Sequence, residues 1–151
     1  MRGPVVYLDS SAMVKRYVLE PNSDRVRKLY LRAYSGEVTL SYSVWNICEV
    51  LGVFDRARRM GRLDDDGYRV ARRRFLLETR RMVRTASAVV LPLKVEILKD
   101  CWRLIERHHI YEADALQIVS AKHVNAAEFL TGDEKLHEVA LAEGLNSAYL
   151  G

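Results

Sequence analysis

The chain has 151 residues and a mass of 17.4 kDa, which is the size of one compact domain, so we expect residues 1–151 to form a single unit. With 49% hydrophobic and 29% charged residues, the composition excludes a disordered chain. The longest apolar run, residues 44–54, is too short to cross a bilayer and is interrupted by Asn46 and Glu49. An acid at position 9 precedes any apolar stretch of signal-peptide length, so we expect a cytoplasmic protein that does not contact a membrane.

The positive charge is concentrated in one segment. The whole chain carries +4, with an isoelectric point near 9.2. Residues 56–84 contain eleven arginines and four acids, so this segment carries +7 and the remainder −3. Such a basic arm indicates contact with a polyanion. The alternative is a solvated helical face whose charges pair with one another.

Strand and helix patterns alternate along the chain. In chain order they predict a strand at 5–9, helices at 11–18 and 23–34, a strand at 37–40, helices at 43–60 and 65–83, a strand at 88–91, helices at 94–108 and 112–123, a strand at 128–131, a helix at 133–143 and a strand at 147–150. Strands separated by helices predict an α/β fold whose parallel sheet is covered on both faces. Ligands of such sheets bind beyond the carboxyl ends of the strands, near the point where strand order reverses.

Two acids follow predicted strands. Asp9 closes the first strand, and Asp133 comes shortly after the strand at 128–131. Both positions also suit a helix N-cap, and for Asp133 capping is as good an interpretation as a functional role. For Asp9 we expect a functional role, because Ser10 and Ser11 can cap the following helix and leave its carboxylate for another use.

Two more acids lie in helices. Glu49 is the only charge in the apolar part of the helix predicted at 43–60, so a metal or an arginine must compensate it. Asp114 suits the dipole at a helix start, but it shares a stripe with Ile118 and Ala121 and is therefore predicted to turn inward.

The residue types narrow the choice of metal. Carboxylates packed together repel one another unless a cation joins them, and oxygen ligands suit Mg²⁺ or Mn²⁺. No histidine has the spacing of a zinc ligand. Cys48 and Cys101 both stand among apolar neighbours, which predicts two buried thiols; a disulfide between them is the alternative.

These blocks together resemble the PIN-domain ribonucleases, especially the VapC-type toxins. The resemblance rests on residues 9–17, Glu49, residues 114–118 and residues 130–133, in that order along the chain. It implies a three-layer α/β/α sandwich with a central parallel sheet. It also implies an endoribonuclease dependent on Mg²⁺ or Mn²⁺, with RNA as substrate, a cognate antitoxin protein as partner and a homodimeric assembly.

The same resemblance assigns roles to individual residues. Asp9 and Asp114 would be the most direct metal ligands, and Glu49 and Asp133 would complete the catalytic site. By the same resemblance, Ser10 and Thr131 would support these four acids.

The basic arm at 56–84 would correspond to a helical pair beside the active-site groove. Five of its arginines lie mostly opposite the apolar residues of their helix and are our candidates for RNA contacts: Arg69, Arg72, Arg73, Arg80 and Arg84. One alternative is a catalytically silent PIN-like module that binds RNA or a protein. Another is a phosphatase of the haloacid-dehalogenase type, which is disfavoured because Ser11 stands where that chemistry needs a second aspartate.

Overall fold

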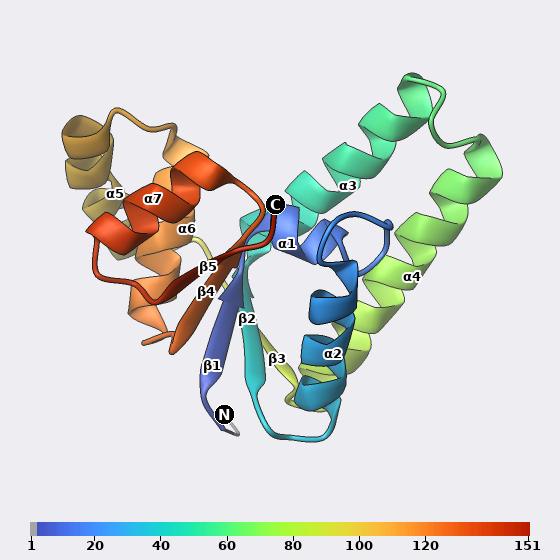
Figure 1. Ribbon diagram of the computed structural model, residues 1–151, viewed down its shortest axis with the longest axis horizontal. Coiled ribbons are helices and arrows are strands. Elements are labelled where there is room, and N and C mark those ends of the chain that lie inside the picture. The colour runs from blue at the N-terminus through green and yellow to red at the C-terminus, as the bar shows by residue number, and fades with distance from the viewer. Residues whose placement is uncertain (1–2) are drawn as a thin grey trace.

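The computed structural model describes residues 3–151. Five parallel strands form a single sheet at the centre of the molecule (Figure 1). The strands are β1 (Val5–Leu8), β2 (Thr39–Ser43), β3 (Ala88–Leu91), β4 (Glu128–Thr131) and β5 (Ser147–Tyr149). Their order is β3-β2-β1-β4-β5, with every neighbouring pair parallel. The chain builds outward from β1 through β3 and then returns to the other side of β1, so strand order reverses between β1 and β4.

Helices cover both faces of this sheet. They are α1 (Ser10–Val14), α2 (Ser23–Tyr34), α3 (Val44–Arg59), α4 (Asp65–Arg84), α5 (Val95–His108), α6 (Glu112–His123) and α7 (Glu134–Ala142). Helices α5, α6 and α7 lie on one side of the strands and α1 to α4 on the other (Figure 1). The predicted three-layer α/β/α sandwich is therefore confirmed. No helix within residues 3–151 combines the length and the apolar character needed to cross a bilayer.

The side chains of β1 and β4 alternate between two hydrophobic cores, as the pleat of a strand requires. Leu8 and Leu130 pack with α1 to α4, whereas Tyr7 and Phe129 pack with α5 to α7. The rings of Tyr7 and Phe129 are stacked, with centroids 5.7 Å apart. Both strands are thus fixed from both faces, which holds their carboxyl ends at defined positions.

Helices α3 and α4 extend beyond the sheet as an antiparallel pair (Figure 1). Three aromatic rings meet edge to face where this pair joins the body: Phe54 and Phe75 at 6.1 Å, and Tyr17 at 5.4 Å from Phe75. The pair contains the basic segment, so the predicted helical arm at 56–84 is confirmed.

Several predicted boundaries were wrong for local reasons. The helix predicted at 11–18 ends at Val14, because residues 15–17 each donate a backbone hydrogen bond only three residues back. The strand predicted at 37–40 runs instead from Thr39 to Ser43, since Gly36, with φ of 83°, still belongs to the turn after α2. Ser43 then caps α3 by accepting a hydrogen bond from the Trp45 amide.

The prediction for the cysteines was wrong in one of two cases. Cys101 is buried in the core of α5 to α7, whereas Cys48 is exposed on α3. Both thiols are free, so the disulfide alternative is not realised.

Candidate active site

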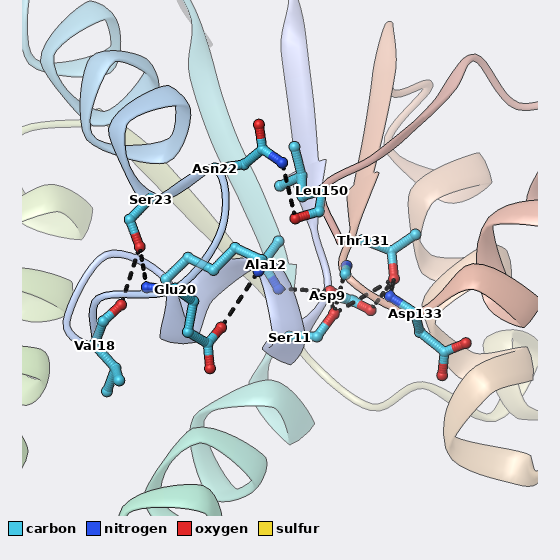
Figure 2. Close-up of polar contacts among 12 residues, drawn as sticks. Asp9, Ser11, Ala12, Val18, Glu20, Asn22, Ser23, Thr131, Asp133 and Leu150 are labelled. Carbon is cyan, nitrogen blue, oxygen red and sulfur yellow. Dashed lines mark hydrogen bonds and ion pairs between the residues drawn. The ribbon is translucent and has the colours of Figure 1, made fainter.

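Asp9 is buried at the carboxyl end of β1, where only 5% of its surface is exposed (Figure 2). Its Oδ1 accepts hydrogen bonds from the Ser11 hydroxyl at 2.6 Å and the Ala12 amide at 2.9 Å. Its Oδ2 accepts one from the Thr131 hydroxyl at 2.6 Å. Asp9 is therefore itself the N-cap of α1, and the expectation that Ser10 or Ser11 would cap was wrong, because the extended backbone of Asp9 brings its carboxylate to the Ala12 amide.

Asp133 lies beside Asp9, at the carboxyl end of β4 (Figure 2). It caps α7 through a 3.0 Å hydrogen bond from the Leu136 amide to Oδ1. The buried Thr131 hydroxyl donates to Asp9 and accepts from the Asp133 amide at 3.0 Å. One threonine thus connects the ends of the two strands between which strand order reverses.

Two different serines follow Asp9. The Ser11 hydroxyl donates to Asp9 and accepts from the Gly132 amide at 2.8 Å, so it joins α1 to the loop after β4. Ser10, the serine expected to support the site, lies close enough to Glu49 to lower the pKa of that carboxyl by hydrogen bonding. Sequence reasoning therefore missed Ser11, although its place two residues after a capping aspartate is a recognisable signal.

Glu49 and Asp114 approach from helices, Glu49 from α3 and Asp114 from the first turn of α6. Both are half-buried. Among residues 3–151, no lysine, arginine or histidine forms an ion pair with Glu49. The alternative of a buried ion pair at Glu49 is therefore not what the structure contains.

A buried polar network adjoins these two acids. Gln117 Nε2 donates to Asn46 Oδ1 at 2.6 Å, and Asn46 Nδ2 donates to the Leu8 carbonyl at 3.0 Å. The Tyr7 hydroxyl donates to Gln117 Oε1 at 2.9 Å. Asn46 stands one helical turn before Glu49 and Gln117 one turn after Asp114, so the network fixes α3 and α6 against β1.

Sequence reasoning did not single out this pair of amides. Two amide side chains inside otherwise apolar helical segments, each one turn from an acid, are the signal that would have found them.

The charge of at least one other acid of the set acts on Asp9, on Glu49 and on Asp114. The pKa of Glu49 is raised to about 7 by burial and then by the charges of Asp9 and Asp114. The pKa of Asp9 is raised to about 6, mainly by burial, with a contribution from Asp133. Burial and the charge of Asp133 raise the pKa of Asp114. The structure therefore brings all four predicted acids into one electrostatic group at the switch point of the sheet.

The donor chemistry of this group suits a hard cation, since every member offers carboxylate oxygens. Within residues 3–151, no three aspartate, glutamate, histidine or cysteine side chains converge as closely as the ligands of one bound ion. The charges of neighbouring acids raise the pKa values of Asp9, Glu49 and Asp114, but the carboxylates do not converge at a single point.

The arm presents its arginines to solvent. The five candidate RNA contacts are all exposed on α4: Arg69, Arg72, Arg73, Arg80 and Arg84. Phe75, Thr79 and Met82 form the buried face of the same helix. Of the five, Arg69 has an ion pair, with Asp66 at 3.5 Å. The charged face and the apolar face are thus separated as the sequence pattern predicts.

Comparisons with solved structures show the same fold. VapC20 from Mycobacterium tuberculosis, a sarcin-ricin loop cleaving toxin, superposes with a TM-score of 0.63 at 13% identity, covering 93% of this chain and 95% of that one. PAE2754 from Pyrobaculum aerophilum gives 0.67 at 18% identity, covering 95% and 83%. FitAcB from Neisseria gonorrhoeae gives 0.65 at 17% identity, covering 94% and 95%.

Sequence comparison is informative at the level of the family. No curated protein matches this chain. The sequence profile of the PIN domain, a domain generally found in nucleases, matches residues 6–142 and therefore includes all four acids. Since this match spans most of the chain, the protein belongs to the PIN-domain family.

Proposed function

We propose that this protein is an endoribonuclease that hydrolyses RNA phosphodiester bonds with Asp9, Glu49, Asp114 and Asp133. The observation that carries the proposal is that carboxylates from four separate segments are held close although their charges repel: Thr131 bonds to both Asp9 and Asp133, the charge of Asp133 raises the pKa of Asp9 and Asp114, and the charges of Asp9 and Asp114 raise that of Glu49. Such repulsion is unfavourable to folding, and groups with perturbed pKa values concentrate at functional sites.

Mg²⁺ or Mn²⁺ is the cofactor that this group of acids suits, and PIN-domain nucleases generally use a divalent metal. We assign Asp9 and Asp114 as the most direct ligands and Glu49 and Asp133 as the residues that complete the site. A bound cation supplies positive charge that lowers the pKa of a water molecule and stabilises the leaving oxygen.

The chain's own residues position the carboxylates for this chemistry. Hydrogen bonds from Ser11 and Thr131 hold both oxygens of Asp9 in one orientation. The buried Asn46 and Gln117 amides hold the helices that carry Glu49 and Asp114. Positioning of this kind lets the acids act without reorganising during the reaction.

The substrate and partners follow from charge and from similarity. The exposed arginines of α4 suit the phosphate backbone of RNA. The similar structure of VapC20, a toxin, supports a role as the toxin of a toxin-antitoxin pair, with a cognate antitoxin as the protein partner and the cytoplasm as the place of action.

A homodimer is the assembly that the apolar surface supports. Val95, Leu98 and Trp102 are exposed along one face of α5, and 63% of Trp102 is exposed. Leu98 also lines an apolar cavity of about 260 Å³ together with Trp45 of α3 and Leu116 of α6. We propose that a second copy covers this face, since an exposed apolar patch of this kind marks an interaction site.

Cleavage of a structured RNA in Mg²⁺, Mn²⁺ or EDTA tests the proposal. We expect cleavage with either cation, none in EDTA, and a loss of at least about a hundredfold in Asp9→Asn, comparable to the loss of one catalytic charge-stabilising group. Asp24→Asn, at an exposed acid in the first turn of α2, is the matched control and should keep full activity. RNA binding without cleavage in every buffer would instead identify a catalytically silent module.

A further inference from the structure

A further cavity adjoins the residues next to Asp9 and Asp133. Its volume is about 290 Å³, and the following residues line it: Ser11, Val14, Lys15, Glu20, Val53 and Gly132. Ser11 is hydrogen-bonded to Asp9, and Gly132 immediately precedes Asp133. The cavity therefore begins where the candidate active site ends.

Lys15 is the cation of this cavity and is almost completely buried, with 4% of its surface exposed. Within residues 3–151 its ammonium group has one ionic partner, Glu20, at 3.3 Å, which is longer than a good charge-assisted hydrogen bond of about 2.7–2.9 Å. A buried ammonium group is unfavourable unless it is well compensated. This lysine is thus held in the cavity by a long contact to the Glu20 carboxylate.

The Lys15 side chain lies directly against the loop that carries Asp133. A methyl group placed on Gly132 would come within 3.2 Å of Lys15 Cε and 3.3 Å of Ser11 Oγ. Glycine leaves this space open, which allows the lysine to approach the loop closely. Positive charge is therefore placed at the edge of an otherwise acidic site.

The backbone that carries Glu20 is fixed from two sides (Figure 2). The Glu20 amide donates to Ser23 Oγ at 2.9 Å, and the Ser23 hydroxyl donates to the Val18 carbonyl at 3.0 Å. Asn22 Nδ2 donates to the Leu150 carbonyl at 3.2 Å, beyond the end of β5. The Glu20 side chain itself is 39% exposed, so its carboxylate can leave Lys15 without any rearrangement of the loop.

We propose that Lys15 forms a subsite for a phosphodiester group of the RNA strand, adjacent to the bond that is cleaved, and that the Glu20 carboxylate occupies this subsite in the free protein. The inference rests on the proposed ribonuclease function. A phosphodiester and a carboxylate both present anionic oxygens to an ammonium group, so one can replace the other. The volume is at the lower limit of small-ligand pockets, roughly 300–1,000 Å³, and suits one phosphate and its sugar.

Binding of a labelled single-stranded RNA oligonucleotide in EDTA, measured over a range of salt concentrations, tests the subsite without cleavage. Lys15→Met should weaken binding and reduce the salt slope by about 0.7, the value for one single-strand phosphate contact. Glu20→Gln should tighten binding severalfold, because the competing charge is gone while the shape is kept. Lys28→Met removes the same charge from the exposed face of α2 and should leave the salt slope within experimental error of wild type.

The two substitutions should change RNA affinity in opposite directions, and this separates a phosphate subsite from a structural ion pair. Breaking a purely structural ion pair from either side would weaken binding or leave it unchanged. Unchanged or weaker binding by Glu20→Gln overturns the subsite, as does a Lys15→Met slope equal to that of Lys28→Met. Glu20→Gln decides the question even where Lys15→Met fails to fold. If a polyglutamate peptide displaced the labelled RNA as well as unlabelled RNA does, the subsite would also be overturned, because the cavity would then be a site for acidic protein segments.

Failure of the subsite is distinguishable from failure of the proposed function. Wild-type protein that binds RNA in EDTA with the expected variant pattern but never cleaves it with Mn²⁺ would refute only the ribonuclease. Wild-type protein that cleaves, with the KM for RNA unaltered in Glu20→Gln, would refute only the subsite.

Discussion

Asp9 caps a helix and still keeps an acceptor position for a ligand, because a carboxylate has about four acceptor positions and the structure uses three of them. The remaining position is on Oδ2, the oxygen held by Thr131. Capping and catalysis are thus compatible roles for one side chain. The same holds for Asp133, where a single hydrogen bond to Oδ1 caps α7.

Glu49 allows a test by stability rather than by activity. Its pKa is raised by burial and by Asp9 and Asp114, so Glu49→Gln removes a repelled charge while keeping the shape. We expect the variant to melt a few degrees above wild type in EDTA, as a gain of about 1 kcal/mol gives roughly 2–4 °C in a domain of this size. Mn²⁺ should then stabilise wild type more than the variant, because the variant has a weaker ligand set.

Differential scanning calorimetry in both buffers measures this, with Glu106→Gln at an exposed position of α5 as the control that should not change either melting temperature. A Glu49→Gln protein that melts well below wild type with and without Mn²⁺ would show that Glu49 is structural. At most three acids would then remain for catalysis.

The residues of the site could be predicted from sequence to different degrees. The four acids stand out because a charge at a strand end, or alone in an apolar helical segment, needs an explanation. Ser11, Asn46 and Gln117 give a weaker signal than the acids, since an uncharged polar residue is also compatible with a cap, a surface or a core. Only the fold shows that their partners are Asp9, the Leu8 carbonyl and one another.

At the level of elements, a single carboxylate fastens α4 to the body. Glu78 accepts two hydrogen bonds from the Arg16 guanidinium and one each from the Tyr17 and Tyr34 hydroxyls, all at 2.9 Å. Burial raises the pKa of Glu78, but the hydrogen bonds and charge of Arg16 outweigh burial, so the net shift is downward. This contact is a clamp: its four hydrogen bonds join α4 to the segment after α1, which carries Arg16 and Tyr17, and to Tyr34 at the end of α2.

Replacing this carboxylate should destabilise the protein in a pH-dependent way. A lowered folded-state pKa gives a stabilisation that is fully present above the unfolded value of 4.5 and is lost as pH falls through the folded value. Glu78→Gln should therefore reduce the free energy of unfolding at pH 7 by about 1.5–3 kcal/mol, the range for hydrogen bonds to charged groups. The deficit should shrink on acidification below pH 4.5.

Urea unfolding at pH 7 and at acidic pH measures the Glu78 effect. Glu106→Gln is again the matched control and should behave like wild type at both pH values. A Glu78→Gln deficit that is equal at both pH values would show that shape, and not charge, explains the clamp.

The arginines of α4 predict a salt-dependent interaction with RNA. Replacing Arg69, Arg73 and Arg80 by glutamine should flatten the slope of log affinity for RNA against log salt by about 0.7 for each phosphate that the arm no longer neutralises. Filter binding or fluorescence anisotropy over a salt series provides the measurement.

The control removes three charges elsewhere, from the exposed Arg27, Arg32 and Arg103. Its slope should stay close to that of wild type. If both triple variants flattened the salt slope equally, overall charge and not the arm would determine binding. The arm would then be the solvated, salt-bridged helical face of the alternative interpretation.

The order and type of the elements could be predicted because their periodicity is strong, whereas the ends depended on contacts that a sequence does not show. The 3.6-residue apolar period of residues 65–84 identifies α4 directly. The early end of α1 could not be predicted in this way. Residues 15–17 lie outside the helix, where Lys15 lines its cavity and Tyr17 packs against Phe75. Tertiary packing decides such boundaries over local propensity.

The whole molecule divides its charge between the acid group at the switch point and the basic arm that extends beyond the sheet (Figure 1). The proposed ribonuclease function would use the arm to bind the RNA backbone and the acids to hold the cation. The proposal thus places binding and chemistry in different parts of the chain.

The exposed apolar face of α5 predicts that two copies of the protein associate. Light scattering at micromolar concentration should give a mass about twice 17.4 kDa for wild type. Trp102→Glu should give the monomer mass, since it places a charge in the proposed interface. Leu31→Glu, at a similarly exposed position on α2, should remain dimeric, and a wild-type mass of 17.4 kDa would contradict the homodimer.

Calorimetric titration with Mn²⁺ decides whether the four carboxylates form one divalent-cation site, on which the proposed chemistry depends. Wild type should bind Mn²⁺, and Asp9→Asn and Asp114→Asn should each weaken that binding by at least about tenfold, equivalent to about 1.4 kcal/mol. Asp24→Asn, outside the group, should bind as wild type does. Absence of Mn²⁺ binding by wild type, or equal affinity in all four proteins, would contradict a shared cation site.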